Sequence, residues 1–471
     1  MQEQDKYIED IVRRVIGELE KQTQCGVCYS GAKGIFDDVE SAVDAASAAF
    51  KKWIETPRGT KENIIEELRV CMHANAEEFS HLAVAETGMG RITDKIVKHH
   101  NAATHTPGME DLETRSWSGD KGLVYEDYAP YGVVAAVTPS THPVPVLFNS
   151  LVMLIAAGNS VVFNVHPAAK KLSAHALEKF NEVIIKNGGP ENLACMLREP
   201  TIEGAEKLFA HPEIKLIVAT GGPSLVKAAF AAGKKVIAAG PGNPPVLVDE
   251  TADIRKAVKC IIEGGSFDNN ILCIAEKEVF VVEGVYDKFM DEMERQGCVR
   301  IPFPKIKELG AKVFSVNAKG EISISRDFIG KNASVLAKAI GINISDEVRL
   351  LFGECETTCK WVAEEQMMPF MPIVRVASFE EGVKLSVKFE RGYGHTAVIH
   401  SRNIEHITRF TKALDVDILV VNGSSLAGLG GNSGEGYFSH TIASPTGEGI
   451  CTPRNFARVR RLAVADGLQI T

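Results

Sequence analysis

Apolar residues recur at helical spacing in the first segment of the chain, separated by charged and polar residues. They follow the i, i+3, i+4, i+7 pattern of a helix with one apolar face, and they are Ile8, Ile11, Val12, Val15, Ile16 and Leu19. Residues 1–21 are therefore predicted to form an amphipathic helix. Residues 22–34 are polar and rich in small residues, which is typical of a linker. A helix detached in this way either packs on its own domain or docks on a partner protein.

The pattern changes along the remaining chain. Residues 37–50 and 60–84 keep helical spacing, and from residue 133 short apolar runs alternate with helical segments. Such near-continuous apolar runs are typical of buried parallel strands. The runs are 133–137, 160–163, 216–219, 236–238, 246–248, 278–282 and 418–421. The simplest organisation that this order predicts is two α/β units in tandem.

Composition places the chain among ordinary globular proteins. Its 471 residues, 45% hydrophobic and 24% charged, suffice for about two or three domains with cores of their own. The net charge of −9 argues against a general affinity for nucleic acid or anionic membrane surfaces. No apolar run approaches the length of a membrane span. We therefore expect a cytoplasmic protein.

The ten cysteines are scattered, as in a reduced intracellular protein. Close pairs occur at Cys25/Cys28 and at Cys355/Cys359. A zinc site from these pairs is the weaker alternative, because neither pair has flanking histidine ligands. Unpaired thiols and no bound metal are the expectation.

A glycine turn follows one of the predicted strands. Residues 215–219 lead into Thr220, Gly221 and Gly222, and residues 224–232 then have helical spacing. A helix N-terminus after such a turn presents exposed amide groups to a phosphate. The turn lacks the full G-x-G-x-x-G pattern, and glycines also serve strand-to-helix turns for conformational reasons alone. Both interpretations stay open on this motif alone.

Cys273 follows Asp268, Asn269 and Asn270, which favour a turn. We expect its thiol on a loop or helix start, where amide dipoles lower a thiol pKa. An arbitrary cysteine is more often a buried structural residue, and composition alone does not select this one. Its interpretation as a nucleophile depends on the motifs around it.

Several motifs occur in a fixed order between residues 34 and 465. They are Thr-Pro-Ser-Thr at 138–141, Asn-Val-His-Pro-Ala-Ala-Lys-Lys at 164–171, Gly-Pro-Gly-Asn-Pro-Pro-Val at 240–246, the Cys273 segment at 266–273, Met-Met-Pro at 367–369, His-Thr-Ala-Val-Ile-His-Ser at 395–401 and Pro-Thr-Gly-Glu-Gly at 445–449. Together they resemble the CoA-acylating propionaldehyde and acetaldehyde dehydrogenases of bacterial microcompartments, within the aldehyde dehydrogenase superfamily. The resemblance is specific for the family and less so for the aldehyde.

The resemblance implies the α/β aldehyde dehydrogenase fold. Residues 35–239 would form an NAD-binding Rossmann-like domain, and residues 240–425 an α/β catalytic domain. A small oligomerisation element would combine strands near residues 119–129 with a strand in the return segment 426–471. A homodimer or homotetramer is expected on the same basis. The helix at residues 1–21 would dock on microcompartment shell protein by its apolar face.

The resemblance also implies a reaction. Cys273 would attack the carbonyl of a short aliphatic aldehyde, with propionaldehyde favoured, while its backbone amide and the Thr141 side chain hold the oxyanion. NAD would accept the hydride, and coenzyme A would then take the acyl group from the cysteine. His395 matches a family histidine near the active site, which leaves a catalytic and a structural role equally open.

The cofactor contacts that the resemblance implies follow the predicted strands. They are Thr138, Pro139, Asn164, His166, Pro167, Thr220, Gly221, Gly222 and Glu365. Glu365 would hold the nicotinamide ribose. Hydrolytic members of the superfamily hold the adenosine ribose with a Lys and a Glu where this chain has Asn164 and Pro167. That ribose must therefore be held in another way.

An absence favours acyl transfer over hydrolysis. Hydrolytic members carry Glu-Leu-Gly-Gly before the second domain, and its Glu activates water against the thioester. The matching stretch at residues 237–242 is Ile-Ala-Ala-Gly-Pro-Gly, without a carboxylate. A CoA thiol, with a pKa of about 8.5, ionises more readily than water, with a pKa of about 15.7, so thiolysis can do without that base. A hydrolytic enzyme with a relocated base and a catalytically silent shell-binding member remain as alternatives.

One position departs from the family pattern. Related enzymes commonly have Ser-Thr-Asn-Pro where this chain has Ser-Thr-His-Pro at 140–143. The imidazole of His142 could narrow the aldehyde site, bond a substrate hydroxyl or face away. The identity of the aldehyde stays open.

Overall fold

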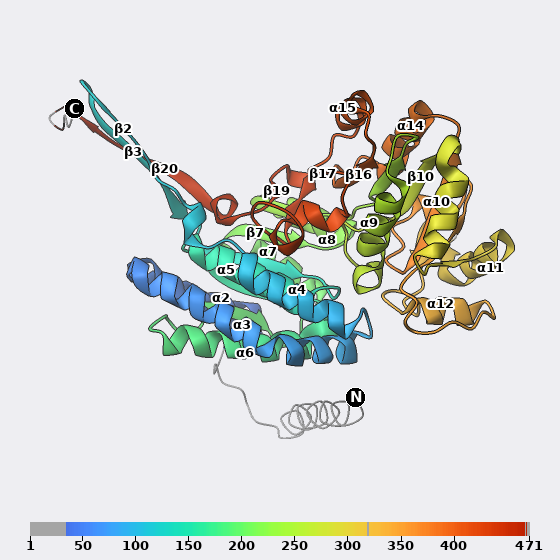
Figure 1. Ribbon diagram of the computed structural model, residues 1–471. Coiled ribbons are helices and arrows are strands. Elements are labelled where there is room, and N and C mark those ends of the chain that lie inside the picture. Colours follow the sequence, from blue (N-terminus) through green and yellow to red (C-terminus); the bar gives the residue numbers. More distant parts are fainter. Residues whose placement is uncertain (1–33, 318–319, 467, 469–471) are drawn as a thin grey trace, which may run out of the picture.

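The computed structural model describes residues 34–317, 320–466 and 468 (Figure 1). The predicted helix at 1–21 and nearly all of the predicted linker at 22–34 lie outside the described residues. The described chain forms two large parallel sheets with helices packed on them, and an antiparallel arm that extends away from both (Figure 1).

The first sheet has the strand order β1-β6-β5-β4-β7-β8, and all neighbours are parallel. Its strands are β1 (Ile35–Phe36), β4 (Val133–Thr138), β5 (Ser160–Val165), β6 (Ala194–Leu197), β7 (Ile214–Thr220) and β8 (Lys235–Ala239). Every residue of β4 and β5 is buried, which explains why their sequences are apolar without alternation. The four strands predicted here from apolar runs are confirmed.

Helices cover both faces of this sheet. The helices are α2 (Val39–Glu55), α3 (Arg58–Thr87), α4 (Ile92–His105), α5 (Pro143–Ala156), α6 (Lys170–Lys186), α7 (Ile202–Ala210) and α8 (Pro223–Ala231). Alternate residues of β4 belong to different cores: Val134 packs with α3, α5 and α6, whereas Val133 packs with α2 and α7. Side chains of a strand point to opposite faces in turn, so each face buries its own set.

The order of the strands creates a switch point between β4 and β7. From β4 the chain continues to β5 and β6 on one side, and it then returns to add β7 and β8 on the other side. Ligands of open α/β sheets bind at such a point, beyond the carboxyl ends of the strands. Those ends are Thr138 on β4 and Thr220 on β7.

The second sheet has the order β11-β14-β15-β10-β9-β16-β17, and it is also parallel. Its strands are β9 (Pro245–Val248), β10 (Glu278–Val282), β11 (Val299–Arg300), β14 (Leu351–Glu354), β15 (Phe370–Val376), β16 (Thr396–His400) and β17 (Ile418–Val421). Its helices are α9 (Ile254–Ser266), α10 (Glu283–Arg295), α11 (Phe303–Val313), α12 (Ala333–Ala339), α13 (Lys360–Ala363), α14 (Phe379–Glu390) and α15 (Ile404–Ala413). The prediction of two tandem α/β units is confirmed.

Strands β2 (Arg115–Gly119), β3 (Gly122–Pro130) and β20 (Ala457–Ala465) form the antiparallel arm (Figure 1). Short hairpins β12 (Phe314–Val316) with β13 (Ile322–Ile324) and β18 (Ile442–Ala443) with β19 (Gly449–Ile450) complete the strands. Among the described residues, no helix is long and apolar enough to cross a membrane.

Candidate active site

A tight turn places Cys273 between α9 and β10. Asp268, Asn269 and Asn270 have φ values of +48°, +57° and +63°, in the left-handed region that Asp and Asn tolerate best. The Asn270 amide fixes the turn by donating to the backbone oxygens of Gly265 at 2.7 Å and Glu276 at 2.9 Å. The loop that carries Cys273 is thus anchored on both sides.

Gly242 lies directly against this loop. A Cβ atom at Gly242 would lie 2.8 Å from the Cys273 carbonyl oxygen and 3.0 Å from Cγ of His395. A side chain does not fit in that space without displacing one of them. The structure therefore brings together Cys273, His395 and the stretch at 237–242 that lacks a carboxylate.

The environment of Cys273 disfavours its thiolate. Burial, and next the negative charge of Glu365, raise the pKa of Cys273 to about 12, while Lys277 and the backbone amides of Cys273 and Ile274 lower it. The amides act in the predicted direction, but the prediction of a lowered pKa is wrong for the thiol as a whole. Burial and the approach of Glu365 arise from tertiary structure and outweigh the local dipoles.

Glu365 lies beside the cysteine, between two groups that favour its ionised form. Burial raises the pKa of Glu365 to about 7, while the Lys277 charge and a hydrogen bond from the Gly242 backbone oppose this shift. Its neighbour Glu364 instead forms an ion pair with Arg391, 3.0 Å away. Of this pair, Glu365 is thus the carboxylate whose charge acts on Cys273, and its predicted role in holding a ribose stays a prediction.

Lys277 is a residue that sequence reasoning missed. Its side chain is fully buried, and its Nζ donates to the backbone oxygen of Asn270 at 2.8 Å and also to the Asn270 side chain. Burial lowers the pKa of Lys277, and the charges of Glu365 and Cys273 raise it. The available sequence signal was the run Glu276-Lys277-Glu278, in which two charges precede a fully buried strand and the third is its first residue.

His395 is buried and neutral. Its Nδ1 lies 2.8 Å from Oγ1 of Thr396, and its Nε2 has no hydrogen-bond partner among the described residues. Burial, and to a lesser extent the charge of Lys277, lower the pKa of His395 to about 4. The imidazole therefore serves as a neutral hydrogen-bonding group beside Gly242, and its predicted catalytic role stays a prediction.

A buried ion cluster connects the cysteine loop to the loop that carries Thr141. The carboxylate of Asp268 pairs with Lys95, 3.0 Å away, and with Lys98. The Lys95 ammonium also donates to the backbone oxygen of Thr141 at 3.4 Å. Burial alone would raise the pKa of Asp268. The positive charges of the two lysines outweigh burial, so the pKa of Asp268 is lowered overall. These α4 lysines escaped sequence analysis, since charged helix positions are normally solvated.

Unpartnered polar atoms mark the switch point of the first sheet. The Oγ1 atoms of Thr138 and Thr220 and the Oδ1 atom of Asn164 are buried without a hydrogen-bond partner among the described residues. Buried polar atoms in native proteins normally have partners, so a ligand with hydroxyl or amide groups fits these ends. Thr138 and Thr220 therefore lie at the edge where open α/β sheets bind ligands, with Asn164 on the neighbouring strand β5, and their contacts with a dinucleotide stay a prediction.

The glycine turn after β7 leaves a helix N-terminus open. Gly222 is the N-cap of α8 and offers no side chain, and a Cβ added there would meet no atom within 4 Å. Exposed amides at a helix N-terminus suit a phosphate. Gly221 precedes it, and its amide is taken by the Ala239 backbone oxygen at 3.2 Å.

His166 and Pro167 follow the end of β5, and Pro139 directly follows β4. The pKa of His166 is lowered by burial and then by the positive charge of Arg326, which comes from the second α/β unit. Sequence analysis did not single out Arg326, whose positive charge acts on His166 at the end of β5.

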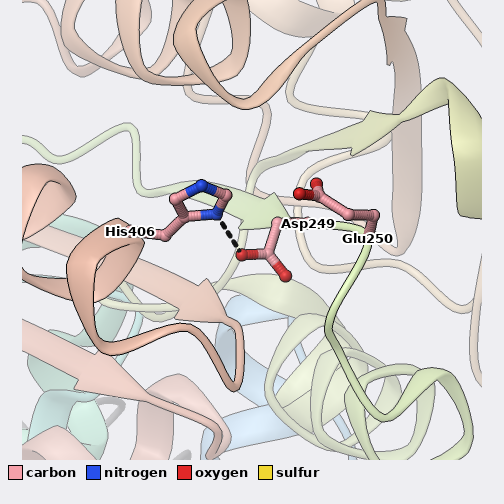
Figure 2. Close-up of side chains that lie close together, drawn as sticks. All are labelled: Asp249, Glu250 and His406. Atoms are coloured by element: carbon pink, nitrogen blue, oxygen red, sulfur yellow. Dashed lines mark hydrogen bonds and ion pairs between the residues drawn. The ribbon is translucent and has the colours of Figure 1, made fainter.

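A second polar cluster lies away from this site. Figure 2 shows His406 turned toward Asp249, and its Nδ1 is 2.8 Å from Oδ2 of that residue. The other oxygen of Asp249 accepts hydrogen bonds from Thr251. The His406 ring stacks on Phe379 with ring centroids 3.8 Å apart. These contacts give the cluster a structural role, because they hold the loop after β9 against α15.

The fold and the site together define a class of protein, a dehydrogenase with a dinucleotide-binding sheet and a cysteine set beside it. The model of the aldehyde dehydrogenase family matches residues 20–437, and the chain belongs to this family.

Known proteins are similar over nearly the whole chain. An acetylating acetaldehyde dehydrogenase of Salmonella typhimurium is 42% identical over 472 residues, covering 100% of both chains. A propionaldehyde dehydrogenase from the fucose utilisation microcompartment of Clostridium phytofermentans has a TM-score of 0.90 and 42% identity, covering 93% of this chain and 100% of that one. A Rhodopseudomonas palustris propionaldehyde dehydrogenase with bound CoA and an acylated cysteine has a TM-score of 0.90 and 38% identity, with the same coverage. The predicted resemblance to CoA-acylating aldehyde dehydrogenases is confirmed.

Proposed function

We propose that the protein oxidises a short aliphatic aldehyde, such as propionaldehyde, to the corresponding acyl-CoA, with NAD as hydride acceptor and coenzyme A as acyl acceptor. The observation that carries the proposal is the contact of Gly242 with the Cys273 loop. At this place, where hydrolytic members have their activating Glu, residues 237–242 present no carboxylate to a thioester on Cys273. The similarity to a relative with bound CoA and an acylated cysteine supports the same reaction.

The first half of the reaction forms a thioester. The Cys273 thiolate attacks the aldehyde carbon, and the carbonyl oxygen becomes an oxyanion held by the Cys273 backbone amide and by Thr141. The Lys277 ammonium stabilises the thiolate before attack. Bound NAD would supply the hydride acceptor for the same carbon, after which the carbonyl re-forms as an acyl thioester.

The second half transfers the acyl group. The sulfur of ionised coenzyme A attacks the thioester carbon, and the Cys273 thiolate leaves as acyl-CoA forms. The thiol of coenzyme A gives up one proton to solvent, so aldehyde, NAD and coenzyme A become acyl-CoA, NADH and a proton. No general base is needed to deprotonate coenzyme A, because a thiol with a pKa of about 8.5 is already partly ionised near neutral pH.

The test measures NADH formation from propionaldehyde with and without coenzyme A, together with the product. Wild type is expected to form NADH beyond a single turnover only with coenzyme A, and to form propionyl-CoA. Cys273→Ala should be inactive, and the matched variant Cys71→Ala, at another partly buried cysteine, should keep full activity. Free propionate as the product would instead support hydrolysis, with Glu365 as the available base.

The predicted helix at 1–21 supports a further part of the proposal, encapsulation within a bacterial microcompartment. Its apolar face at helical spacing, ahead of a linker, suits docking on shell protein. Deletion of residues 1–22 should abolish co-purification with shells and leave activity in solution unchanged. Encapsulation of the deletion variant at the wild-type level would refute this docking.

The arm suits assembly into a homodimer or homotetramer. Strand β20 lies at its edge, and Val459 and Leu462 are 64% and 58% exposed on it. An exposed apolar edge strand is suited to pairing with a second copy of the chain.

A further inference from the structure

Two histidine rings stack beside the proposed reacting centre. His142, the N-cap residue of α5, and His440 have ring centroids 5.7 Å apart and planes inclined by 22°. Phe438 packs edge-on against His440 with centroids 4.9 Å apart. The two imidazoles are 7% and 8% exposed, so they form a buried wall with polar atoms in it.

His142 belongs to the same network as the cysteine loop. The Nζ atom of Lys98 lies 2.7 Å from Nδ1 of His142 and also pairs with Asp268, the first residue of the turn before Cys273. His142 directly follows Thr141, the candidate oxyanion ligand. The stacked rings are therefore linked to both loops at which the aldehyde is proposed to react.

The hydrogen bonds assign the protonation of His142. An ammonium group only donates, so Nδ1 of His142 accepts and the neutral ring carries its hydrogen on Nε2. Burial, followed by the positive charge of Lys98, keeps the pKa of His142 well below its ordinary value, so that the ring stays neutral at physiological pH. The Nε2–H group of His142 is thus a hydrogen-bond donor.

His440 supplies the complementary group. Its Nε2 is buried with no hydrogen-bond partner among the described residues, although its backbone N–H is satisfied by Asn149 at 3.1 Å. Burial lowers the pKa of His440 to about 3, so this ring is also neutral. A buried, unpartnered nitrogen in a ring that stacks on His142 suits a ligand that accepts from one ring and donates to the other.

We propose that His142 and His440 form a hydroxyl-binding subsite and that the preferred substrate is a short aldehyde bearing a hydroxyl group. This inference rests on the proposed function and narrows its substrate. A hydroxyl can accept from Nε2–H of His142 and donate to Nε2 of His440, whereas propionaldehyde leaves the buried Nε2 of His440 unpaired. An anionic substituent fits less well, because both rings are neutral and Lys95 and Lys98 are already paired with Asp268.

The test compares kcat/KM for 3-hydroxypropanal and propionaldehyde, which have equal carbon chains, in the full-length enzyme with NAD and coenzyme A. Wild type should prefer the hydroxyaldehyde by about tenfold or more, because sites built for a hydroxyl discriminate against analogues that lack it. His440→Phe should reduce kcat/KM for 3-hydroxypropanal by about ten- to a hundredfold and leave propionaldehyde within about twofold. His142→Leu should likewise reduce kcat/KM for 3-hydroxypropanal more than kcat/KM for propionaldehyde.

Two further variants separate hydrogen bonding from packing. His440→Gln, which keeps a polar side chain, should retain part of the preference, and the control His81→Phe on α3 should change neither substrate. A wild-type preference for propionaldehyde, or equal losses on both aldehydes in both His440→Phe and His142→Leu, would overturn the subsite. Absence of CoA-dependent NADH formation from either aldehyde in wild type would overturn the proposed function itself.

Discussion

The Nζ atom of Lys277 donates a 2.8 Å hydrogen bond to the backbone oxygen of Asn270, across the loop that carries Cys273. The contact does two things at once. It satisfies the carbonyl of a residue held at φ +63°, and it keeps a buried positive charge beside a thiol whose pKa is otherwise raised. Loop geometry and nucleophile chemistry thus depend on the same side chain.

Replacement of Lys277 by methionine should therefore affect both properties. Loss of the positive charge raises the pKa of Cys273 further, so alkylation of Cys273 by iodoacetamide at pH 8 should slow by about tenfold for each unit of pKa shift. Loss of the donor leaves a buried carbonyl unpaired and should lower the free energy of unfolding by about 1–3 kcal/mol. Urea unfolding and the alkylation rate against pH measure the two effects, and Lys288→Met on the exposed face of α10 is the control. An alkylation profile identical to wild type would show that Lys277 has no electrostatic role.

Replacement of Glu365 should change the pKa of Cys273 in the opposite direction to replacement of Lys277. The charge of Glu365 raises the pKa of Cys273, so Glu365→Gln should speed alkylation at a fixed pH even while it weakens cofactor binding. The pKa of Glu365 is raised to about 7, so its carboxylate forms as the pH rises through that value. A carboxylate accepts hydrogen bonds from ribose hydroxyls on both oxygens, and the KM for NAD should fall over the same range in wild type.

The comparison needs the neighbouring glutamate as control. Glu364→Gln removes a carboxylate that pairs with Arg391, and it should leave the pH dependence of the KM for NAD intact. Glu365→Gln should raise that KM at pH 8 and abolish its pH dependence. If the KM for NAD in Glu365→Gln followed the wild-type profile, Glu365 would not contact the cofactor.

The two parallel sheets could be predicted because their strands are buried on both faces. Runs such as 133–137 and 246–248 are continuously apolar for that reason, and each became a strand. Strands β1 and β11 have two residues each, too few to give any pattern. The order of the strands in each sheet could not be predicted from the sequence either, since it depends on contacts between segments far apart in the chain.

The candidate site was predictable only where a motif surrounds the residue. Cys273 and His395 stand in motifs and Glu365 lies two residues before one, and the structure gathers all three around Gly242 and Lys277. Lys95 and Lys98 lie in no motif and could not be predicted, because a charged helix residue is normally solvated. Their burial is tolerable only because both lysines pair with Asp268, which is distant in sequence. The raised pKa of Cys273 escaped prediction for the same reason, since burial is a property of the folded chain.

The arm leads to a prediction about assembly. Val459 and Leu462 are exposed on edge strand β20, while the arm is held internally by ion pairs such as Arg460 with Asp127, whose Nε to Oδ1 distance is 3.0 Å. Replacing Val459 and Leu462 together by aspartate would place one charge on each face of edge strand β20, and an interface that covers either face would bury an unpaired charge. This should raise the dissociation constant of the assembly by about a hundredfold or more, without unfolding the chain. Light scattering after size-exclusion chromatography measures the change, with Ile202→Asp as control because Ile202 is 80% exposed at the start of α7, where an acidic residue is favourable. An unchanged molar mass of the double variant at micromolar concentration would mean that subunits meet on another surface.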